Sequence, residues 1–427
     1  MDLKQKIRDK SALIGVLGLG YVGFPLSCVI ADSGFKVSGI DINKENTERI
    51  NKGVSIIDEK NLPEIAKKVV ENGNLVAGTD YSVLNRCDII IICVQTPLSE
   101  GHIPLYEFLK SACESVSSAI GENALVIIES TIAPGTTDNI IKPILDKSKK
   151  IYFLAHSPER VLPGNLIHEL INNDRIIGGV DVESTELAKE FYSTFVKGHV
   201  ISTSAKVAEM TKVAENTYRD VNIAYANELA LVCEELGINV YEVIKYANMH
   251  PRVNILSPGC GVGGHCIPKD PWLLASSSKR DIRLVEEARR LNEFMIKRMF
   301  HLMKTAEHRK KIDVGKVAIF GLTYKGDIKD TRQASGIKLK NELIENGIKE
   351  ICTYDPYIES DSFNHSLENA DVLFICTEHK EFNKWDSNKL NEIKNLMRNP
   401  IIIDGRNVVD KKLAEEAGFL YMGIGNI

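Results

Sequence analysis

The glycine-rich segment Gly18-Leu-Gly20-Tyr-Val-Gly23 constrains the fold of this chain more than any other feature of its sequence. It follows an apolar run at 12–17 that is typical of a buried strand, and it opens a run at 25–32 that is typical of a helix. In this setting the first glycine allows a tight turn, the second lets a phosphate approach the backbone, and the third lets helix and strand pack closely. The pattern predicts a strand-turn-helix unit that binds a dinucleotide.

Asp41 stands at the end of the next predicted strand, 36–40. A carboxylate at this position can accept hydrogen bonds from both ribose hydroxyls, and its charge would repel a 2′-phosphate. We therefore predict NAD rather than NADP as the cofactor. The alternative, a glycine-rich turn beside an unrelated aspartate, is disfavoured by the order of strand, turn and helix.

Apolar, β-branched runs alternate with helical stretches through the first half of the chain. Besides the two strands above, such runs lie at 88–94, 124–129 and 151–155, and several are apolar at nearly every position, as strands covered on both faces are. Alternating strands and helices imply βαβ units and hence a parallel sheet.

The middle of the chain has a different pattern. From 206 onward there is no proline or glycine until Gly237, which predicts one long helix that ends at a glycine. More helix is predicted at 240–247 and 283–304, and strand character resumes at 316–321. The predicted fold class is α/β, with two Rossmann-like, doubly wound parallel-sheet domains joined by a central helical domain. We expect the three domains to span 1–203, 204–306 and 307–427.

Two pairs of segments suggest that the first and last domains are related. The segment 87–96 resembles 370–378, and 38–41 resembles 352–355. A duplicated α/β domain explains both pairs, although buried parallel strands also resemble one another without common origin.

Composition excludes several classes of protein. The net charge of -5 gives no broad basic field, so nucleic acid is not an expected partner. The apolar stretch 12–30 is interrupted by glycines and a proline, so we expect neither a signal peptide nor a membrane span. The nine cysteines are odd in number and thinly spread, which favours reduced thiols and a cytoplasmic protein.

A second glycine-rich loop, 257–270, holds a cysteine. Four glycines and two prolines surround Cys266, with His265 and Asp270 close in sequence. A thiol beside a bound nicotinamide suggests covalent capture of an aldehyde, which yields a thioester after oxidation. A zinc site formed by Cys260, His265 and Cys266 is less favoured because it lacks a CxxC pair, so we predict no metal. An inert buried cysteine is the remaining alternative.

Polar residues on the long helix could form part of the same site. Lys212, Asn216 and Arg219 are spaced to share one helix face, although a charged stripe is more often solvated surface. The segment 156–164, which follows a predicted strand, brings Glu159 and its neighbours to a sheet edge, where a carboxylate and an arginine suit water activation or phosphate binding. A surface ion pair is the alternative.

Two threonine-containing loops also follow predicted strands. Thr96 and Thr131 lie where parallel strands end, and ligands of open α/β sheets bind along that edge. Ordinary turn chemistry explains threonine and proline at these positions equally well.

Taken together, the motifs VLGLGYVG, ESTIAPGTT, SPERVLPG, KVAENTYRDVNIAYANE, GGHCIPKDPW and GLTYK resemble those of the UDP-glucose/GDP-mannose dehydrogenase family. The resemblance extends from Leu13 to about Gly405. It implies an enzyme that oxidises the C6 alcohol of a nucleotide sugar to a carboxylate with two NAD.

The resemblance also implies roles for individual residues. Cys266 would be the nucleophile, Lys212 would exchange a proton with the C6 oxygen, and Asn216 would orient a water or the oxyanion. Glu159 would assist thioester hydrolysis, with Asp270 supporting the water or Lys212. The residues implied in NAD binding are Gly18, Gly20, Tyr21, Val22, Gly23, Asp41, Thr96, Thr131 and Arg332. Those implied in nucleotide-sugar binding are Arg160, Val161, Lys212, Asn216, Arg219, His250, Arg252, Gly263, Tyr324 and Lys325.

Within the family, the segment His250-Pro-Arg-Val-Asn254 favours a UDP-N-acetylhexosamine, with UDP-N-acetyl-D-mannosamine as the first expectation. UDP-N-acetylglucosamine is the alternative substrate. A second alternative is a two-electron dehydrogenase of the 3-hydroxyacid type, which would not explain the cysteine loop. A third is a regulatory protein that senses NAD, which would not need Cys266, Lys212, Asn216 and Glu159.

The resemblance further implies a homodimer or tetramer paired through the central helix, on a surface that includes Ala224, Leu229 and Ala230. Two departures from the family pattern stand out. Cys260 occupies a position where relatives carry proline, and 330–335 lacks the usual Ser-Pro after Arg332. We interpret Cys260 as a small core residue.

Overall fold

The computed structural model describes residues 2–427 and divides into two compact units. Of the described residues, unit 1 comprises 2–215 and 272–279, and unit 2 comprises 216–271 and 280–427. Helix α9 (Ala205–Leu236) contributes to both units, and so does α11 (Asp270–Ser276). The division into three domains, with the boundaries given above, remains a prediction.

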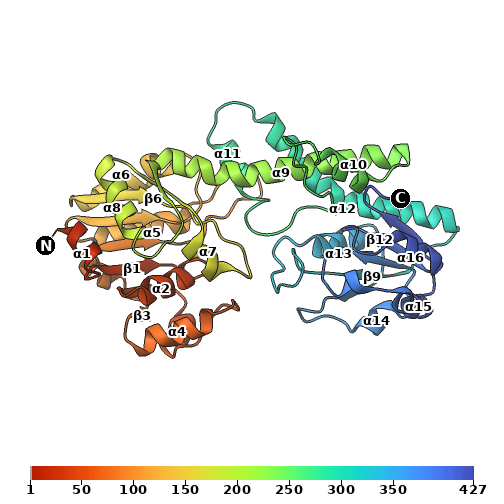
Figure 1. Ribbon diagram of the computed structural model, residues 1–427, viewed down its shortest axis with the longest axis horizontal. Helices are drawn as coiled ribbons and strands as arrows, with labels where there is room; N and C mark the ends of the chain where they lie inside the picture. The colour runs from red at the N-terminus through yellow and green to blue at the C-terminus, as the bar shows by residue number, and fades with distance from the viewer. Residues whose placement is uncertain (1) are drawn as a thin grey trace. The chain divides into compact units, whose positions relative to one another are not determined.

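Unit 1 is built on an eight-stranded sheet with the order β3-β2-β1-β4-β5-β6-β7-β8 (Figure 1). All neighbouring strands are parallel except β6 and β7, which are antiparallel. Its strands are β1 (Leu13–Leu17), β2 (Lys36–Ile40), β3 (Leu75–Gly78), β4 (Ile89–Ile92), β5 (Ala124–Ile128), β6 (Tyr152–His156), β7 (Arg175–Gly179) and β8 (Val200–Ser204). Its helices are α1 (Leu3–Arg8), α2 (Gly23–Asp32), α3 (Lys44–Asn51), α4 (Leu62–Glu71), α5 (Glu107–Ala119), α6 (Lys142–Leu145), α7 (Leu166–Asn172) and α8 (Val182–Tyr192).

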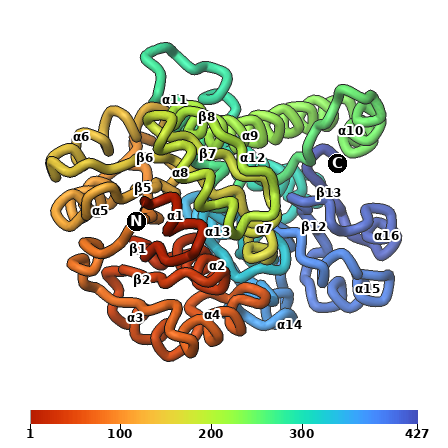
Figure 2. Tube along the Cα trace, turned by 60° about the vertical axis from the view of Figure 1, so that its left-hand side comes forward, coloured from red at the N-terminus to blue at the C-terminus, as the bar shows by residue number. Residues whose placement is uncertain are grey.

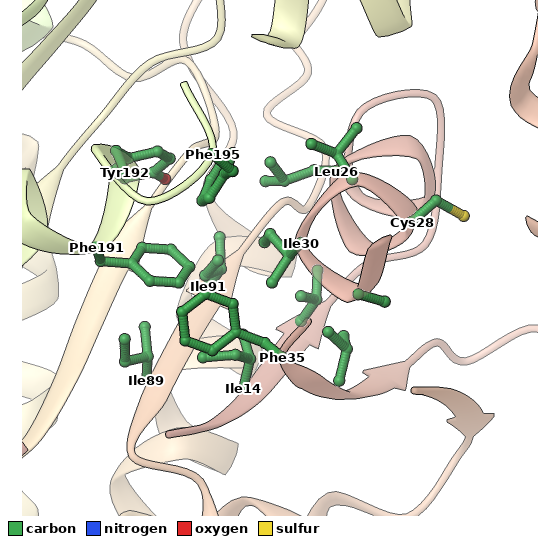
Figure 3. Packing of buried hydrophobic residues seen from close by; sticks show 14 of the residues in the cluster. Ile14, Leu26, Cys28, Ile30, Phe35, Ile89, Ile91, Phe191, Tyr192 and Phe195 are labelled. Carbon is green, nitrogen blue, oxygen red and sulfur yellow. The ribbon is translucent and has the colours of Figure 1, made fainter. Parts of the chain in front are cut away.

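The central strands of this sheet are apolar at every position because helices cover both faces. Ile89 and Ile91 of β4 pack into the core formed with α2, α7 and α8, while Ile90 and Ile92 pack into the core formed with α5. Figure 3 shows the first core, in which the rings of Phe35 and Phe191 meet edge to face with centroids 5.6 Å apart. Burial on both faces therefore fixes the sheet and the edge from which its loops emerge.

Unit 2 contains a five-stranded parallel sheet with the order β10-β9-β11-β12-β13. Its strands are β9 (Lys316–Phe320), β10 (Glu350–Tyr354), β11 (Val372–Ile375), β12 (Ile401–Asp404) and β13 (Leu420–Gly423). Its helices, besides parts of α9 and α11, are α10 (Val240–Ala247), α12 (Arg283–Lys310), α13 (Ser335–Glu345), α14 (Phe363–Leu367), α15 (Ser387–Leu396) and α16 (Lys411–Glu416), of which α15 and α16 lie side by side (Figure 2).

The two sheets share one arrangement over five strands. The order β10-β9-β11-β12-β13 repeats β2-β1-β4-β5-β6, so the segments that resemble each other in sequence, β4 with β11 and the end of β2 with that of β10, occupy matching places. Asp41 accepts a hydrogen bond from the Leu19 N–H, and Asp355 accepts one from the Leu322 N–H. The predicted α/β fold, with two Rossmann-like sheets and a helical region between them in the chain, is confirmed.

Candidate active site

The turn between β1 and α2 has the geometry that its glycines predict. Gly18 has a φ of +86°, and a Cβ there would lie 2.7 Å from the Cys93 carbonyl oxygen. A Cβ on Gly23 would overlap the carbonyl oxygen of Gly18. At Gly20, in contrast, no atom lies within 4 Å of where a Cβ would stand. The turn thus leaves backbone N–H groups at the start of α2 open to a phosphate, and these residues fit a dinucleotide.

Asp41 lies directly after β2 and supports this turn. One carboxylate oxygen accepts from the Leu19 N–H at 2.7 Å, and the other accepts from the Asn43 N–H at 2.8 Å. Tyr21, inside the turn, is half-buried and donates its hydroxyl to Glu59 at 2.6 Å. Val22 precedes the first residue of α2 and is half-buried as well.

The two threonine loops come together. The Thr96 hydroxyl donates to the Thr131 carbonyl oxygen at 2.7 Å, because β4 and β5 are neighbours and both loops follow their carboxyl ends. Ser130 joins the same cluster by donating to the Val94 carbonyl oxygen at 2.7 Å. From the sequence, a ligand-binding role and ordinary turn chemistry explain these two threonines equally well. The structure brings both threonines to the edge of the sheet where ligands of α/β folds bind.

Glu159 and Lys212 form a buried ion pair with an N–O distance of 3.3 Å. Burial alone would raise the pKa of Glu159, but the Lys212 charge and a hydrogen bond from the Val161 N–H outweigh it, so the pKa is lowered. The surface alternatives are therefore wrong for these two residues, since both side chains are removed from solvent. A carboxylate held ionised beside a lysine can accept a proton from water or exchange one with the lysine.

A second buried ion pair, between Arg175 and Glu129, acts on Glu159. Arg175 at the start of β7 pairs with Glu129 and donates to the Ser157 hydroxyl at 3.1 Å. Its guanidinium also stands 4.4 Å from the ring centre of Tyr192, which itself donates to Glu129. Arg175 contributes to the lowered pKa of Glu159, so buried charges alternate in sign from Glu129 to Lys212.

Arg160 contacts α9 one turn beyond Lys212. Its guanidinium binds Glu215 of α9 in two places, at 2.5 and 3.2 Å, and donates to the Asp174 carbonyl oxygen at 3.2 Å. Lys212 and Glu215 are three residues apart on α9. The 157–164 loop therefore contacts this helix twice, through Glu159 with Lys212 and through Arg160 with Glu215.

In unit 2, Asn216 connects the helix to the cysteine loop. Its amide donates to Asp270 at 2.6 Å, and the Asp270 N–H donates to the Cys266 carbonyl oxygen at 2.9 Å. Asn216 and Asp270 are buried and Cys266 is half-buried. The carboxylate thus fixes the position of the thiol-bearing turn relative to this part of α9.

The cysteine loop also packs on the segment that follows β9. A Cβ on Gly263 would lie 2.8 Å from the Tyr324 Cβ, and the Gly264 N–H donates to the Arg332 carbonyl oxygen at 2.9 Å. Burial, together with the charges of Asp330 and Cys266, raises the pKa of Tyr324 to about 12, so its hydroxyl remains a donor at neutral pH.

Arg332 and Lys325 differ in how they are held. The Arg332 guanidinium binds both carboxylate oxygens of Asp330, at 3.0 Å from Nε in each case, whereas Lys325 is exposed. Arg219, His250 and Arg252 are also exposed, so they are not part of the buried cluster around Asn216.

Cys260 is a core residue, as interpreted from the sequence. It is fully buried, and its thiol donates to the Cys376 carbonyl oxygen at 3.5 Å. A side-chain hydrogen bond from the Cys376 thiol, together with the Arg406 charge, lowers the pKa of Cys260. Within residues 2–427, no group of three His, Cys, Asp or Glu side chains could hold a metal ion. Nor does any helix of this stretch have the length and apolar character needed to cross a membrane.

The family of the chain follows from comparison with known proteins. Successive parts of the chain match the NAD binding, central and UDP binding domains of the UDP-glucose/GDP-mannose dehydrogenase family, at 12–196, 206–294 and 318–411. The chain belongs to this family. The NAD cofactor and the nucleotide-sugar dehydrogenase activity predicted from the sequence are confirmed at this level.

Individual relatives resemble the chain over nearly its whole length. UDP-N-acetyl-D-mannosamine dehydrogenase from Methanocaldococcus jannaschii is 46% identical over 97% of this chain and 96% of its own. The solved structure of the Pyrococcus horikoshii enzyme of that name has a TM-score of 0.92 at 44% identity, covering 97% of this chain and 99% of its own. UDP-N-acetyl-mannosamine dehydrogenase from Staphylococcus aureus has a TM-score of 0.86 at 37% identity, covering 97% and 98%.

Proposed function

We propose that this enzyme oxidises the C6 alcohol of UDP-N-acetyl-D-mannosamine to the uronate with two NAD. The observation that carries the proposal is the link from α9 through Asn216 and Asp270 to Cys266, since it fixes a thiol relative to buried polar groups of one helix. The substrate is favoured by the relatives named above and by the His250–Asn254 segment.

The proposed chemistry divides between a base and a thiol. Lys212, in its neutral form, takes the proton of the C6 hydroxyl, and the Glu159 carboxylate stabilises the resulting ammonium. NAD, when bound, accepts one hydride at each of the two oxidations. After the first oxidation the Cys266 thiolate adds to the aldehyde carbon, and Asn216 donates to the oxygen that becomes negative.

Retention of the half-oxidised sugar is the purpose of the thiol. The thiohemiacetal on Cys266 keeps the carbon in place for the second oxidation, which leaves a thioester. Glu159 then takes a proton from water as the water attacks the thioester carbon, the C–S bond breaks, and the thiol and the carboxylate are released. Asp270 positions Asn216 and the Cys266 turn throughout.

The remaining residues are proposed to bind NAD and the nucleotide sugar. The glycine turn, Tyr21 and Val22 hold the pyrophosphate, Asp41 the adenosine ribose, and Thr96 and Thr131 the nicotinamide half, with Arg332 as a further cofactor contact. The nucleotide sugar is proposed to contact Arg160, Val161, Lys212, Asn216, Arg219, His250, Arg252, Gly263, Tyr324 and Lys325. The free state of all nine cysteines supports action in the cytoplasm.

We further propose a homodimer, paired through the second half of α9. The surface residues named from the sequence need correction, because Ala224 and Ala230 are buried within the chain. The exposed apolar side chains of α9 include Tyr218, Tyr225 and Val232, which are spaced seven apart and so share one helix face. Sedimentation of the wild type as a dimer and of Tyr225→Glu as a monomer would support this pairing; a monomeric wild type would contradict it.

A substrate panel tests the proposed activity. UDP-N-acetyl-D-mannosamine, UDP-N-acetylglucosamine, UDP-glucose and GDP-mannose are each incubated with NAD, and NADH is followed by absorbance. The proposal predicts the highest kcat/KM for UDP-N-acetyl-D-mannosamine. A preference for UDP-N-acetylglucosamine would instead support the alternative substrate, and no NADH from any sugar would support a regulatory role.

A further inference from the structure

The Glu59 side chain joins three segments of unit 1. It lies between α3 and α4, and only 5% of the residue is exposed. One of its oxygens accepts from the Tyr21 hydroxyl at 2.6 Å and from the Gly164 N–H at 2.5 Å. The other faces the Leu166 N–H at 3.5 Å. None of the sequence motifs includes this residue.

Besides its own segment, Glu59 joins the glycine turn and the loop proposed to bind the sugar. Tyr21 belongs to the glycine turn, and Gly164 ends the 157–164 loop that contains Glu159 and Arg160. The shape of that loop positions the Glu159 carboxylate, because the carboxylate accepts from the Val161 N–H at 3.0 Å. One carboxylate therefore lies between the cofactor turn and the loop proposed to act on the sugar.

The Glu59 carboxylate connects these segments through hydrogen bonds from one hydroxyl and two backbone N–H groups. An apolar side chain in its place would leave all three donors without this acceptor, so the bridge depends on the carboxylate oxygens.

We propose that Glu59 is a positioning residue that couples NAD binding to nucleotide-sugar binding. NAD in the glycine turn holds Tyr21, whose hydroxyl holds Glu59, which in turn holds the Gly164 end of the 157–164 loop. The loop is then ordered before the sugar arrives, and by linkage the sugar strengthens NAD binding by the same factor. This inference rests on the proposed role of the loop in binding the sugar.

The coupling is measured in a Cys266→Ala parent with NADH, which cannot accept a hydride, so that the first oxidation does not occur. Calorimetry gives the Kd of NADH with and without saturating UDP-N-acetyl-D-mannosamine. We expect the sugar to lower this Kd about tenfold in the parent. Tyr21→Phe, which removes only the hydroxyl, and Glu59→Ala should reduce the effect to less than about twofold, with no further loss in the double variant. Glu59→Gln, which keeps an acceptor oxygen, should restore part of it.

Tyr152→Phe is the matched control. Tyr152 donates to Asp146 at 2.6 Å in the same unit but joins neither loop, so its removal should leave the coupling intact. A coupling that survives both Tyr21→Phe and Glu59→Ala, or a parent that binds both ligands independently, would overturn the inference. A parent that binds NADH but gives no heat with UDP-N-acetyl-D-mannosamine would instead contradict the proposed substrate.

Discussion

The buried pair of Glu159 and Lys212 makes a prediction about stability as well as catalysis. Their charges are 3.3 Å apart and their side chains are 11% and 7% exposed. At an effective dielectric constant of about 20, the attraction is about 5 kcal/mol, before the cost of desolvation. Lys212→Met leaves a buried carboxylate without that partner, so we expect the free energy of unfolding of unit 1 to fall by about 3–5 kcal/mol.

The two tryptophans of the chain allow this loss to be assigned to unit 1. Trp272 lies in unit 1, stacked on His102 with ring centres 4.2 Å apart, and Trp385 lies in unit 2. In a Trp385→Phe background, urea unfolding followed by fluorescence therefore reports on unit 1. A double-mutant cycle of Lys212→Met with Glu159→Gln should give a coupling energy of about 2–3 kcal/mol.

The pH dependence of the free energy of unfolding provides an independent test of the ion pair. Because the folded pKa of Glu159 is lowered, the pair stabilises the protein above the unfolded pKa of about 4.3, and this stability is lost as pH falls through the folded pKa. In Lys212→Met the Glu159 pKa should be raised, so that acid stabilises this variant relative to wild type. Additive single-variant effects, or parallel pH profiles of stability, would show that Glu159 and Lys212 do not stabilise one another.

Three further predictions concern the cofactor turn and the thiol. Asp41→Ala should reduce the preference for NAD over NADP, measured as the ratio of kcat/KM values, and an unchanged ratio would contradict its ribose role. Gly20→Ala should fold normally, by circular dichroism, yet lose NAD binding, whereas Gly23→Ala should also lower the melting temperature because its Cβ would overlap Gly18. Cys266→Ser should stall after one oxidation or accumulate a covalent adduct, visible by intact mass spectrometry; full turnover would exclude the thioester.

The central strands were predictable because their chemistry is uniform. β4 and β5 are apolar throughout and buried throughout, so the sequence gives no competing pattern. The apolar pattern does not predict β7 and β8, since β7 contains two glycines and β8 is polar and largely exposed at the sheet edge. The helix predicted to end at 304 extends to Lys310, because basic residues are favourable in a last helical turn.

The site was predictable only where a motif carries its own chemistry. The glycine turn and Asp41 follow from local spacing, but helical spacing could not tell whether Lys212 and Asn216 face solvent or protein. Both are buried, because the loops holding Glu159 and Asp270 pack on α9 from distant parts of the chain. Glu59 and Arg175 gave no signal, since each acts through contacts with segments far away in sequence.

In the proposed reaction, a single thiol retains the sugar through two oxidations. The most direct test is the number of NADH molecules formed per UDP-N-acetyl-D-mannosamine consumed, measured together with the identity of the product. We expect two NADH and a uronate, with no free aldehyde trapped by a hydrazine. One NADH per sugar, with a released aldehyde or ketone, would contradict it.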